Sequence, residues 1–204
     1  MPGPTLLDMD DPDAMARAET VLRAGGTVVL PTDTVYGLAA LPDLPGATEN
    51  LFALKGRESD HPLAVLVSDA EQGRGLLRDV SERVARWTER LWPGPLTIVG
   101  WRSATSAPFA LGEGSDTIGV RCPDPPFVRS LAAAVGPIAT TSANRTGEPT
   151  PTSARAAVGS LLGPADLVID GGPAGTVAST VVDTTESQWR LLRLGAIGET
   201  ELGG

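Results

Sequence analysis

The sequence predicts a protein of the α/β (α+β) class, with a twisted mixed β-sheet and helices packed on it. Short apolar strands are interleaved with amphipathic helices, but several strands follow one another with no helix between them. That order favours a mixed sheet over a strictly alternating doubly wound fold. The chain has 204 residues, of which 41% are hydrophobic, enough for one domain with a core. We expect an N-terminal arm over residues 1–14 and one domain over 15–204.

The first helix is predicted by a stripe of apolar residues. Ala14, Ala18 and Leu22 recur every four residues after an Asp-Pro-Asp sequence that suits a helix start. A glycine pair then ends the helix. The apolar run 27–30 is predicted to be a buried strand that stops at Pro31.

The remaining elements follow from the same patterns. Apolar runs bounded by turn residues predict strands at 63–67, 96–101, 117–121, 137–140, 167–170, 179–183 and 189–194. Helical spacing predicts helices at 48–54, from Ser81 to Leu91, at 127–135 and 154–162, and a short one at the C-terminus. The Ser-, Ala- and Gly-rich stretch 102–115 is expected to be a mobile loop.

Composition narrows the class of protein. The formal net charge is −9, and an acidic chain does not attract a polyanion through its overall field, so stable nucleic-acid binding needs a local basic patch. The single cysteine, Cys122, excludes an internal disulfide and a cysteine-based zinc site. No signal peptide and no membrane-spanning apolar run are visible, so we expect a cytoplasmic protein.

Polar residues cluster where predicted strands end, which is where α/β sheets bind ligands. They lie in the turn 31–37, in 141–144 and at Arg121. No glycine-rich phosphate motif, nucleophile elbow or pair of metal-binding carboxylates is present, and His61 is the one histidine. Short polar side chains and a few cations remain. Such an inventory suits phosphoryl transfer, in which the protein mainly positions groups and neutralises charge.

Lys55 stands out because it is the one lysine among 16 lysines and arginines. Arginine is a wide planar fork, whereas lysine is a compact charge on a flexible stem. Two interpretations follow. Lys55 provides a point charge against phosphate or a reacting oxygen, or it is a solvated residue with no special role.

Several motifs in a fixed order carry a resemblance to a known family. They are Pro31-Thr-Asp-Thr-Val-Tyr-Gly, Lys55-Gly-Arg57, Trp92-Pro-Gly-Pro-Leu-Thr, Val120-Arg121, Ser142-Ala-Asn144, Asp170-Gly-Gly-Pro173, Ser179-Thr-Val-Val and Leu192-Arg-Leu-Gly195. Over residues 15–200 the chain resembles the YrdC-like family of L-threonylcarbamoyl-AMP synthases, in its short, single-domain form. The resemblance implies a YrdC-like sheet with a concave ligand-binding face.

The resemblance also implies an activity. Such enzymes condense L-threonine, bicarbonate and ATP into L-threonylcarbamoyl-AMP with release of pyrophosphate, the first step of threonylcarbamoyl-adenosine modification of tRNA. Mg²⁺ is expected with ATP, without a dedicated protein site. The expected partners are these small molecules and the proteins that transfer the threonylcarbamoyl group to tRNA, with no membrane.

Residue roles are carried over from the family by motif position. The family's signature tetrad is Lys55, Arg57, Ser142 and Asn144, with Lys55 expected to hold phosphate or the carboxylated intermediate. The positions that match threonine contacts are Thr34, Thr140, Arg121 and Ser179, and those that match ATP contacts are Arg57, His61, Thr117, Ser142, Thr150 and Arg193. His61 stands where relatives often carry asparagine, and Leu194 where they usually carry proline.

Other functions stay open at this stage. One is a carbamoyltransferase domain that forms a carbamoyl-adenylate from carbamoyl phosphate. Another is an RNA-binding module of the same fold without synthase activity, which the acidic balance disfavours. A third is a catalytically altered paralogue, which the intact tetrad disfavours.

Overall fold

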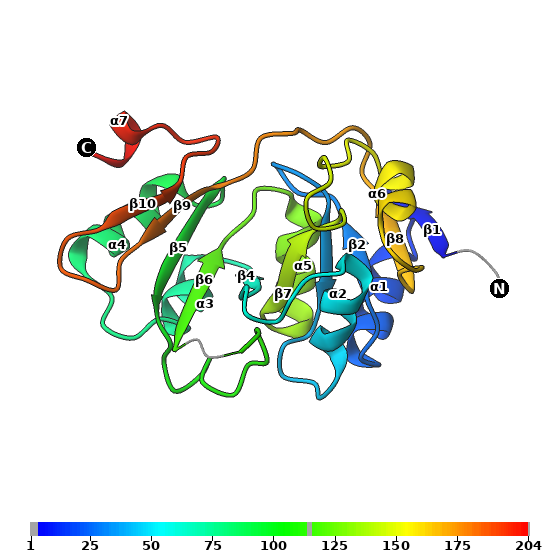
Figure 1. Ribbon diagram of the computed structural model, residues 1–204, viewed down its shortest axis with the longest axis horizontal. Coiled ribbons are helices and arrows are strands. Elements are labelled where there is room, and N and C mark those ends of the chain that lie inside the picture. Colours follow the sequence, from blue (N-terminus) through cyan, green and yellow to red (C-terminus); the bar gives the residue numbers. More distant parts are fainter. Residues whose placement is uncertain (1–3, 114–115, 204) are drawn as a thin grey trace.

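A computed structural model describes residues 4–113 and 116–203 of the chain (Figure 1). Ten strands form one sheet: β1 (Thr5–Asp8), β2 (Val28–Leu30), β3 (Gly37–Ala40), β4 (Ala64–Leu66), β5 (Leu96–Trp101), β6 (Thr117–Arg121), β7 (Ile138–Ser142), β8 (Leu167–Asp170), β9 (Thr180–Asp183) and β10 (Arg190–Arg193). The helices are α1 (Ala14–Arg23), α2 (Ala47–Lys55), α3 (Ala70–Gly75), α4 (Glu82–Leu91), α5 (Pro126–Val135), α6 (Ala154–Ser160) and α7 (Glu199–Leu202). None of these described helices is long and apolar enough to cross a membrane.

The sheet is mixed, as the sequence predicts. Its strand order is β1-β8-β2-β3-β7-β4-β6-β5-β9-β10, so β1 and β10 form opposite edges (Figure 1). It contains parallel pairs, such as β4 with β6 and β5 with β9, and antiparallel pairs, such as β3 with β7. Only β4 separates β6 from β7, and these two strands run in opposite directions, so Arg121 is level with Ile138 and Ser142 lies toward the other end of the sheet.

Two hydrophobic clusters pack against the half of the sheet around β2 and β8. Helices α1 and α5 share one cluster, in which Leu22 and Leu131 are fully buried. Helices α2 and α6 contribute to the other. Neighbouring residues of β2 point to opposite clusters, Val28 and Leu30 to the first and Val29 to the second, because strand side chains alternate. This half of the sheet is thus covered on both faces.

Three elements of the structure are missing from the sequence-based description. Strand β1 lies within the expected N-terminal arm and pairs with β8, but most of its residues are exposed, so it lacks the apolar signal of an inner strand. Strand β3 has the sequence Gly-Leu-Ala-Ala, with low strand propensity, and is held by its pairing with β2 and β7. Helix α3 has six residues, two of them glycine. Residues 1–3 of the arm, and Gly204, lie outside the described residues.

The expected loop 102–115 is anchored in the part that the structure describes. The Ser106 hydroxyl is buried and donates to the Leu76 carbonyl at 2.7 Å, and Leu111 is fully buried. Arg102 also donates from Nε to the Thr117 carbonyl at 3.1 Å. Residues 114–115 lie outside the described residues.

Candidate functional site

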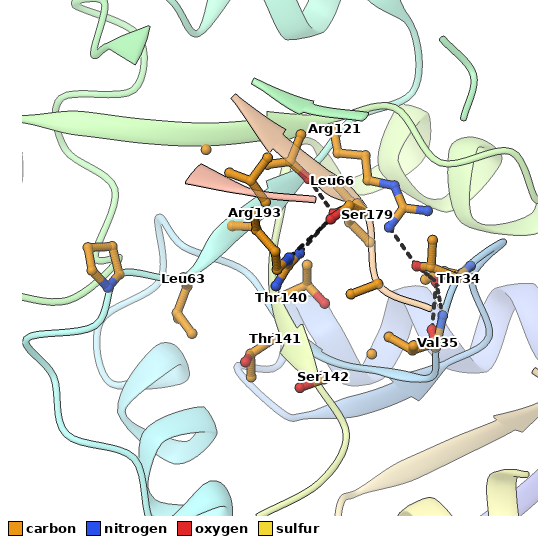
Figure 2. Close-up of a pocket in the computed structure, with 18 of the residues that line it drawn as sticks. Thr34, Val35, Leu63, Leu66, Arg121, Thr140, Thr141, Ser142, Ser179 and Arg193 are labelled. Atoms are coloured by element: carbon orange, nitrogen blue, oxygen red, sulfur yellow. Dashed lines mark hydrogen bonds between the residues drawn. The ribbon is translucent and has the colours of Figure 1, made fainter. Parts of the chain in front are cut away.

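A pocket of about 520 Å³ opens on the face of the sheet formed by β4, β5, β6 and β7 (Figure 2). Alternate residues of β4, β5 and β6 line it, since side chains of a strand alternate between the two faces, and β7 adds three consecutive residues at its end. On β6, Thr117, Gly119 and Arg121 line the pocket, whereas Ile118 and Val120 belong to the hydrophobic core. The site is therefore built on rigid backbone, with small and polar side chains on its open face.

The charge of the pocket is opposite to that of the chain. The charged residues among its described lining are three arginines, Arg57, Arg121 and Arg193. The other polar lining residues carry neutral hydroxyl groups, on Thr32, Thr34, Thr97, Thr117, Thr140, Thr141, Ser142, Thr150 and Ser179. In a protein of net charge −9, this concentration of guanidinium groups favours an anionic ligand.

Three nitrogens of Arg121 are held by two loops from different parts of the chain. Its Nε donates to the Gly94 carbonyl at 3.1 Å, its Nη1 donates to the Thr34 hydroxyl at 2.7 Å, and its Nη2 pairs with the Asp33 carboxylate. The residue is 6% exposed. Burial lowers the pKa of Arg121, and the Asp33 charge acts in the opposite direction. The guanidinium is thus held in one orientation.

The turn beside Arg121 is ordered by Thr32. Its hydroxyl donates to the Val35 carbonyl at 2.6 Å and accepts from the Val35 amide at 3.1 Å. Because its proton is used in this way, the Thr34 hydroxyl must donate to Thr32, at 3.0 Å, while it accepts from Arg121. The Thr34 hydroxyl therefore has a fixed direction at the edge of the pocket (Figure 2).

Arg193 reaches the pocket from β10 and contacts Ser179. Its Nε donates to the Ser179 carbonyl and its Nη2 to the Ser179 hydroxyl, both at 3.1 Å (Figure 2). That hydroxyl also lies 2.8 Å from the Thr97 hydroxyl. Burial lowers the pKa of Arg193.

Arg57 follows α2 and is oriented by neutral oxygens. Its Nε and Nη2 donate to the carbonyls of His61 and Pro62 at 3.0 and 3.2 Å, and its Nη1 donates to the Thr141 hydroxyl at 3.2 Å. Burial lowers the pKa of this side chain too. The nearby Asp60 carboxylate pairs with His61 instead, at 2.6 Å.

Lys55 lies behind the pocket, at the last position of α2. Its Nζ donates to the carbonyls of Ser142 and Asn144 at 2.6 and 2.7 Å, and lies 3.2 and 3.3 Å from their side-chain oxygens. The residue is 4% exposed, and burial, followed by repulsion from Arg57, lowers its pKa to about 8. The interpretation of Lys55 as a solvated residue is therefore wrong. Its ammonium ties α2 to the end of β7, where Ser142 faces the pocket.

Most of the residues singled out from the sequence come together in this pocket. Its lining includes Arg57, Ser142, Thr34, Thr140, Arg121, Ser179, Thr117, Thr150 and Arg193. Lys55, Asn144 and His61 are not part of the lining, and the His61 side chain is 68% exposed. Lys55 and Asn144 lie directly behind Ser142, whereas His61 contributes its carbonyl to Arg57.

Sequence reasoning gave no ligand role to several lining residues, among them Thr32, Thr97 and Thr141, although all three lie in segments that it singled out. A signal for this face exists in the alternation of small or polar with apolar residues, as in Thr117-Ile-Gly-Val-Arg121. This alternation indicates a ligand-binding face only once β6 is known to lie in the middle of the sheet.

The described residues offer no preformed metal site, because no group of three or more His, Cys, Asp or Glu side chains among them is arranged to hold an ion. Cys122 is buried next to Arg121, and burial raises its pKa to about 11, so it is an inert thiol near neutral pH.

Known proteins have sequences similar to this one. The family model Sua5_yciO_yrdC, described as "Telomere recombination", matches residues 20–195. A protein of Bacillus subtilis named threonylcarbamoyl-AMP synthase is 35% identical over 96% of this chain, and the match covers 57% of that protein. A protein of the same name from Chromohalobacter salexigens is 33% identical over 89% of this chain and 97% of its own length. The chain thus spans just over half of the length of the first relative and nearly all of the second.

Solved structures share the fold as well. The crystal structure of Pyrococcus abyssi Sua5 complexed with L-threonine matches 98% of this chain and 58% of that chain, with a TM-score of 0.87 and 35% identity. The sequence and the fold thus agree with one family. The chain belongs to the Sua5/YciO/YrdC family.

Proposed function

We propose that the protein is an L-threonylcarbamoyl-AMP synthase, which uses L-threonine, bicarbonate and ATP and releases pyrophosphate. The single observation that carries this proposal is the pocket, in which three arginines and a set of hydroxyl groups gather in an acidic protein. A triphosphate and an amino-acid carboxylate are anions that such a site would hold. The names of the relatives, and the L-threonine in the Pyrococcus abyssi complex, support the choice of substrates.

The chemistry has two steps. Threonine, from its ammonium form, combines with bicarbonate to give a carbamate, with loss of water and a proton. A carbamate oxygen then attacks the α-phosphorus of ATP, the bond from that phosphorus to the bridging oxygen breaks, and pyrophosphate leaves with the electron pair. Catalysis of the second step requires in-line positioning and stabilisation of charge on phosphate oxygens, which arginines and hydroxyl groups supply.

We assign the two substrates to the two ends of the pocket, which adjoin where Arg193 contacts Ser179. Arg121, with Thr34, Thr140 and Ser179, would hold threonine, and the bidentate guanidinium suits its carboxylate. Arg57 and Arg193, with Thr117, Ser142 and Thr150, would hold ATP. Mg²⁺ would enter with the ATP phosphates, and no step depends on a protein-bound metal ion.

Lys55 and Asn144 would act on this site through Ser142. The expectation that Lys55 also contacts phosphate or the carboxylated intermediate stays a prediction, as does an ATP contact of His61. The product would be consumed by proteins that transfer the threonylcarbamoyl group to tRNA.

Pyrophosphate release tests the proposal. Release should require threonine and bicarbonate together, and the product should have the mass of threonylcarbamoyl-AMP. Release that is independent of threonine would contradict the proposal. Release that requires carbamoyl phosphate instead would identify carbamoyl-adenylate chemistry, and salt-sensitive binding of tRNA without any release would identify an RNA-binding module.

A further inference from the structure

The three pocket arginines differ in what balances their charge. Arg121 is paired with the carboxylate of Asp33, and it is the one pocket arginine with an ion pair among the described residues. Arg57 and Arg193 donate to carbonyl and hydroxyl oxygens, which are neutral. A carboxylate in direct contact thus balances Arg121, whereas Arg57 has only the more distant charge of Asp60 and Arg193 has neutral partners.

Asp33 acts on Arg121 from outside the pocket. Its side chain is 14% exposed and is not part of the pocket lining, although its neighbours Thr32 and Thr34 are. One oxygen, Oδ1, accepts from both Arg121 and the backbone amide of Asp124, the latter at 3.1 Å. The carboxylate is thus fixed at the back of the guanidinium and would not touch a bound ligand.

A fixed negative charge at this point affects different anions unequally. Its repulsion of a ligand grows in proportion to the charge of that ligand. A carboxylate carries one charge, whereas pyrophosphate and the triphosphate of ATP carry several. Asp33 therefore penalises phosphate at Arg121 more strongly than it penalises an amino acid.

From this we propose that Asp33 is a specificity-determining residue, which reserves the Arg121 end of the pocket for a monoanionic carboxylate and directs polyphosphate to Arg57 and Arg193. This inference rests on the proposed function, because it deepens the assignment of the two substrates to two ends. It predicts a competition that the wild-type protein avoids: without the Asp33 charge, polyphosphate should occupy the threonine end.

Direct binding of pyrophosphate, with no turnover, tests this inference. Calorimetric titration should show at least about tenfold tighter pyrophosphate binding to Asp33→Asn than to the wild type. Threonine should compete with pyrophosphate in the variant and bind alongside it in the wild type. Asp33→Glu, which keeps the charge, should behave as the wild type. Asp124→Asn removes the same charge from an exposed neighbouring side chain and should change pyrophosphate affinity much less.

A further variant identifies the source of the gain. Adding Arg121→Gln to Asp33→Asn should remove the extra pyrophosphate affinity. Equal affinity in the wild type and a folded Asp33→Asn protein would overturn the inference. If Asp33→Asn does not fold, titration of the wild-type protein still tests the inference. Competition between pyrophosphate and threonine for the wild type would contradict binding of the two ligands at separate ends of the pocket. These measurements are independent of whether the protein makes threonylcarbamoyl-AMP.

Discussion

Lys55 and Arg121 are both almost fully buried, with 4% and 6% of their surface exposed, but the protein stabilises their charges differently. Arg121 faces a carboxylate, a hydroxyl and a carbonyl. Lys55 has only neutral oxygens around its ammonium, all from Ser142 and Asn144. Arg121 is thus part of an ion pair, whereas the Lys55 ammonium is hydrogen-bonded to neutral oxygens.

The difference matches the positions of the two side chains. Arg121 lines the pocket, where its orientation must be set while some N–H groups stay available; a guanidinium has five and the clamp uses three. Lys55 lies behind the pocket, and its ammonium donates to the backbone carbonyls of Ser142 and Asn144. A compact ammonium can reach both carbonyls of a tight turn, which a planar fork cannot do as well. The comparison therefore separates a ligand-binding cation from a positioning cation.

The largest expected effect is at Arg121. Arg121→Gln removes the proposed carboxylate partner and leaves Asp33 without its cation, and breaking a buried charge pair typically costs 2–5 kcal/mol. We expect kcat/KM for threonine to fall at least about 100-fold, with a much smaller change in KM for ATP. Steady-state pyrophosphate release measures both constants.

Two further variants make the Arg121 result specific. Arg121→Lys keeps the charge but cannot bridge Gly94, Asp33 and Thr34, so it should recover little of the loss. Arg17→Gln changes the same residue type at an exposed position of α1 and should leave both constants unchanged. An Arg121→Gln enzyme with wild-type kinetics for threonine would remove Arg121 from the binding site.

A smaller effect is expected at Lys55. Lys55→Met leaves the Ser142 and Asn144 carbonyls short of a donor, which should lower the free energy of unfolding by about 2–3 kcal/mol. Activity should fall at least about tenfold, and KM should rise more for ATP than for threonine, because Ser142 directly follows Thr141, which Arg57 contacts. Denaturant unfolding and pyrophosphate release provide the two measurements.

Lys55→Arg tests whether the compact shape matters. The wider guanidinium should not fit between the two carbonyls, so this variant should also lose activity while it stays folded. A fully active Lys55→Arg enzyme would show that any positive charge suffices at this position.

The sequence predicted the separate parts of the site better than their assembly. Strands such as 27–30 and 117–121 were found because their residues are apolar or alternate, which reflects burial directly. The rarity of Lys55 pointed to a constrained position, but nothing in the sequence indicates that its partners are backbone carbonyls 87 and 89 residues away. Asp33, Gly94 and Arg121 likewise meet only because the fold brings two loops to the end of β6. Strand β3 was missed because its small residues owe their place to pairing rather than to propensity.

The last predicted effect concerns pH and distinguishes Lys55 from Arg121 by titration. Arg121 stays charged throughout, whereas burial lowers the pKa of Lys55 from 10.5 to about 8. Between these two pKa values the unfolded chain binds more protons than the folded one. The Lys55 contribution to the free energy of unfolding therefore increases with pH in this window, and it is lost as pH falls through about 8. The wild type should therefore gain stability relative to Lys55→Met between pH 8 and 10.5, by at most about 3 kcal/mol. Denaturant unfolding of both proteins across this range measures the difference. A constant or decreasing difference would mean that the surrounding carbonyls favour the ammonium form as strongly as a carboxylate does.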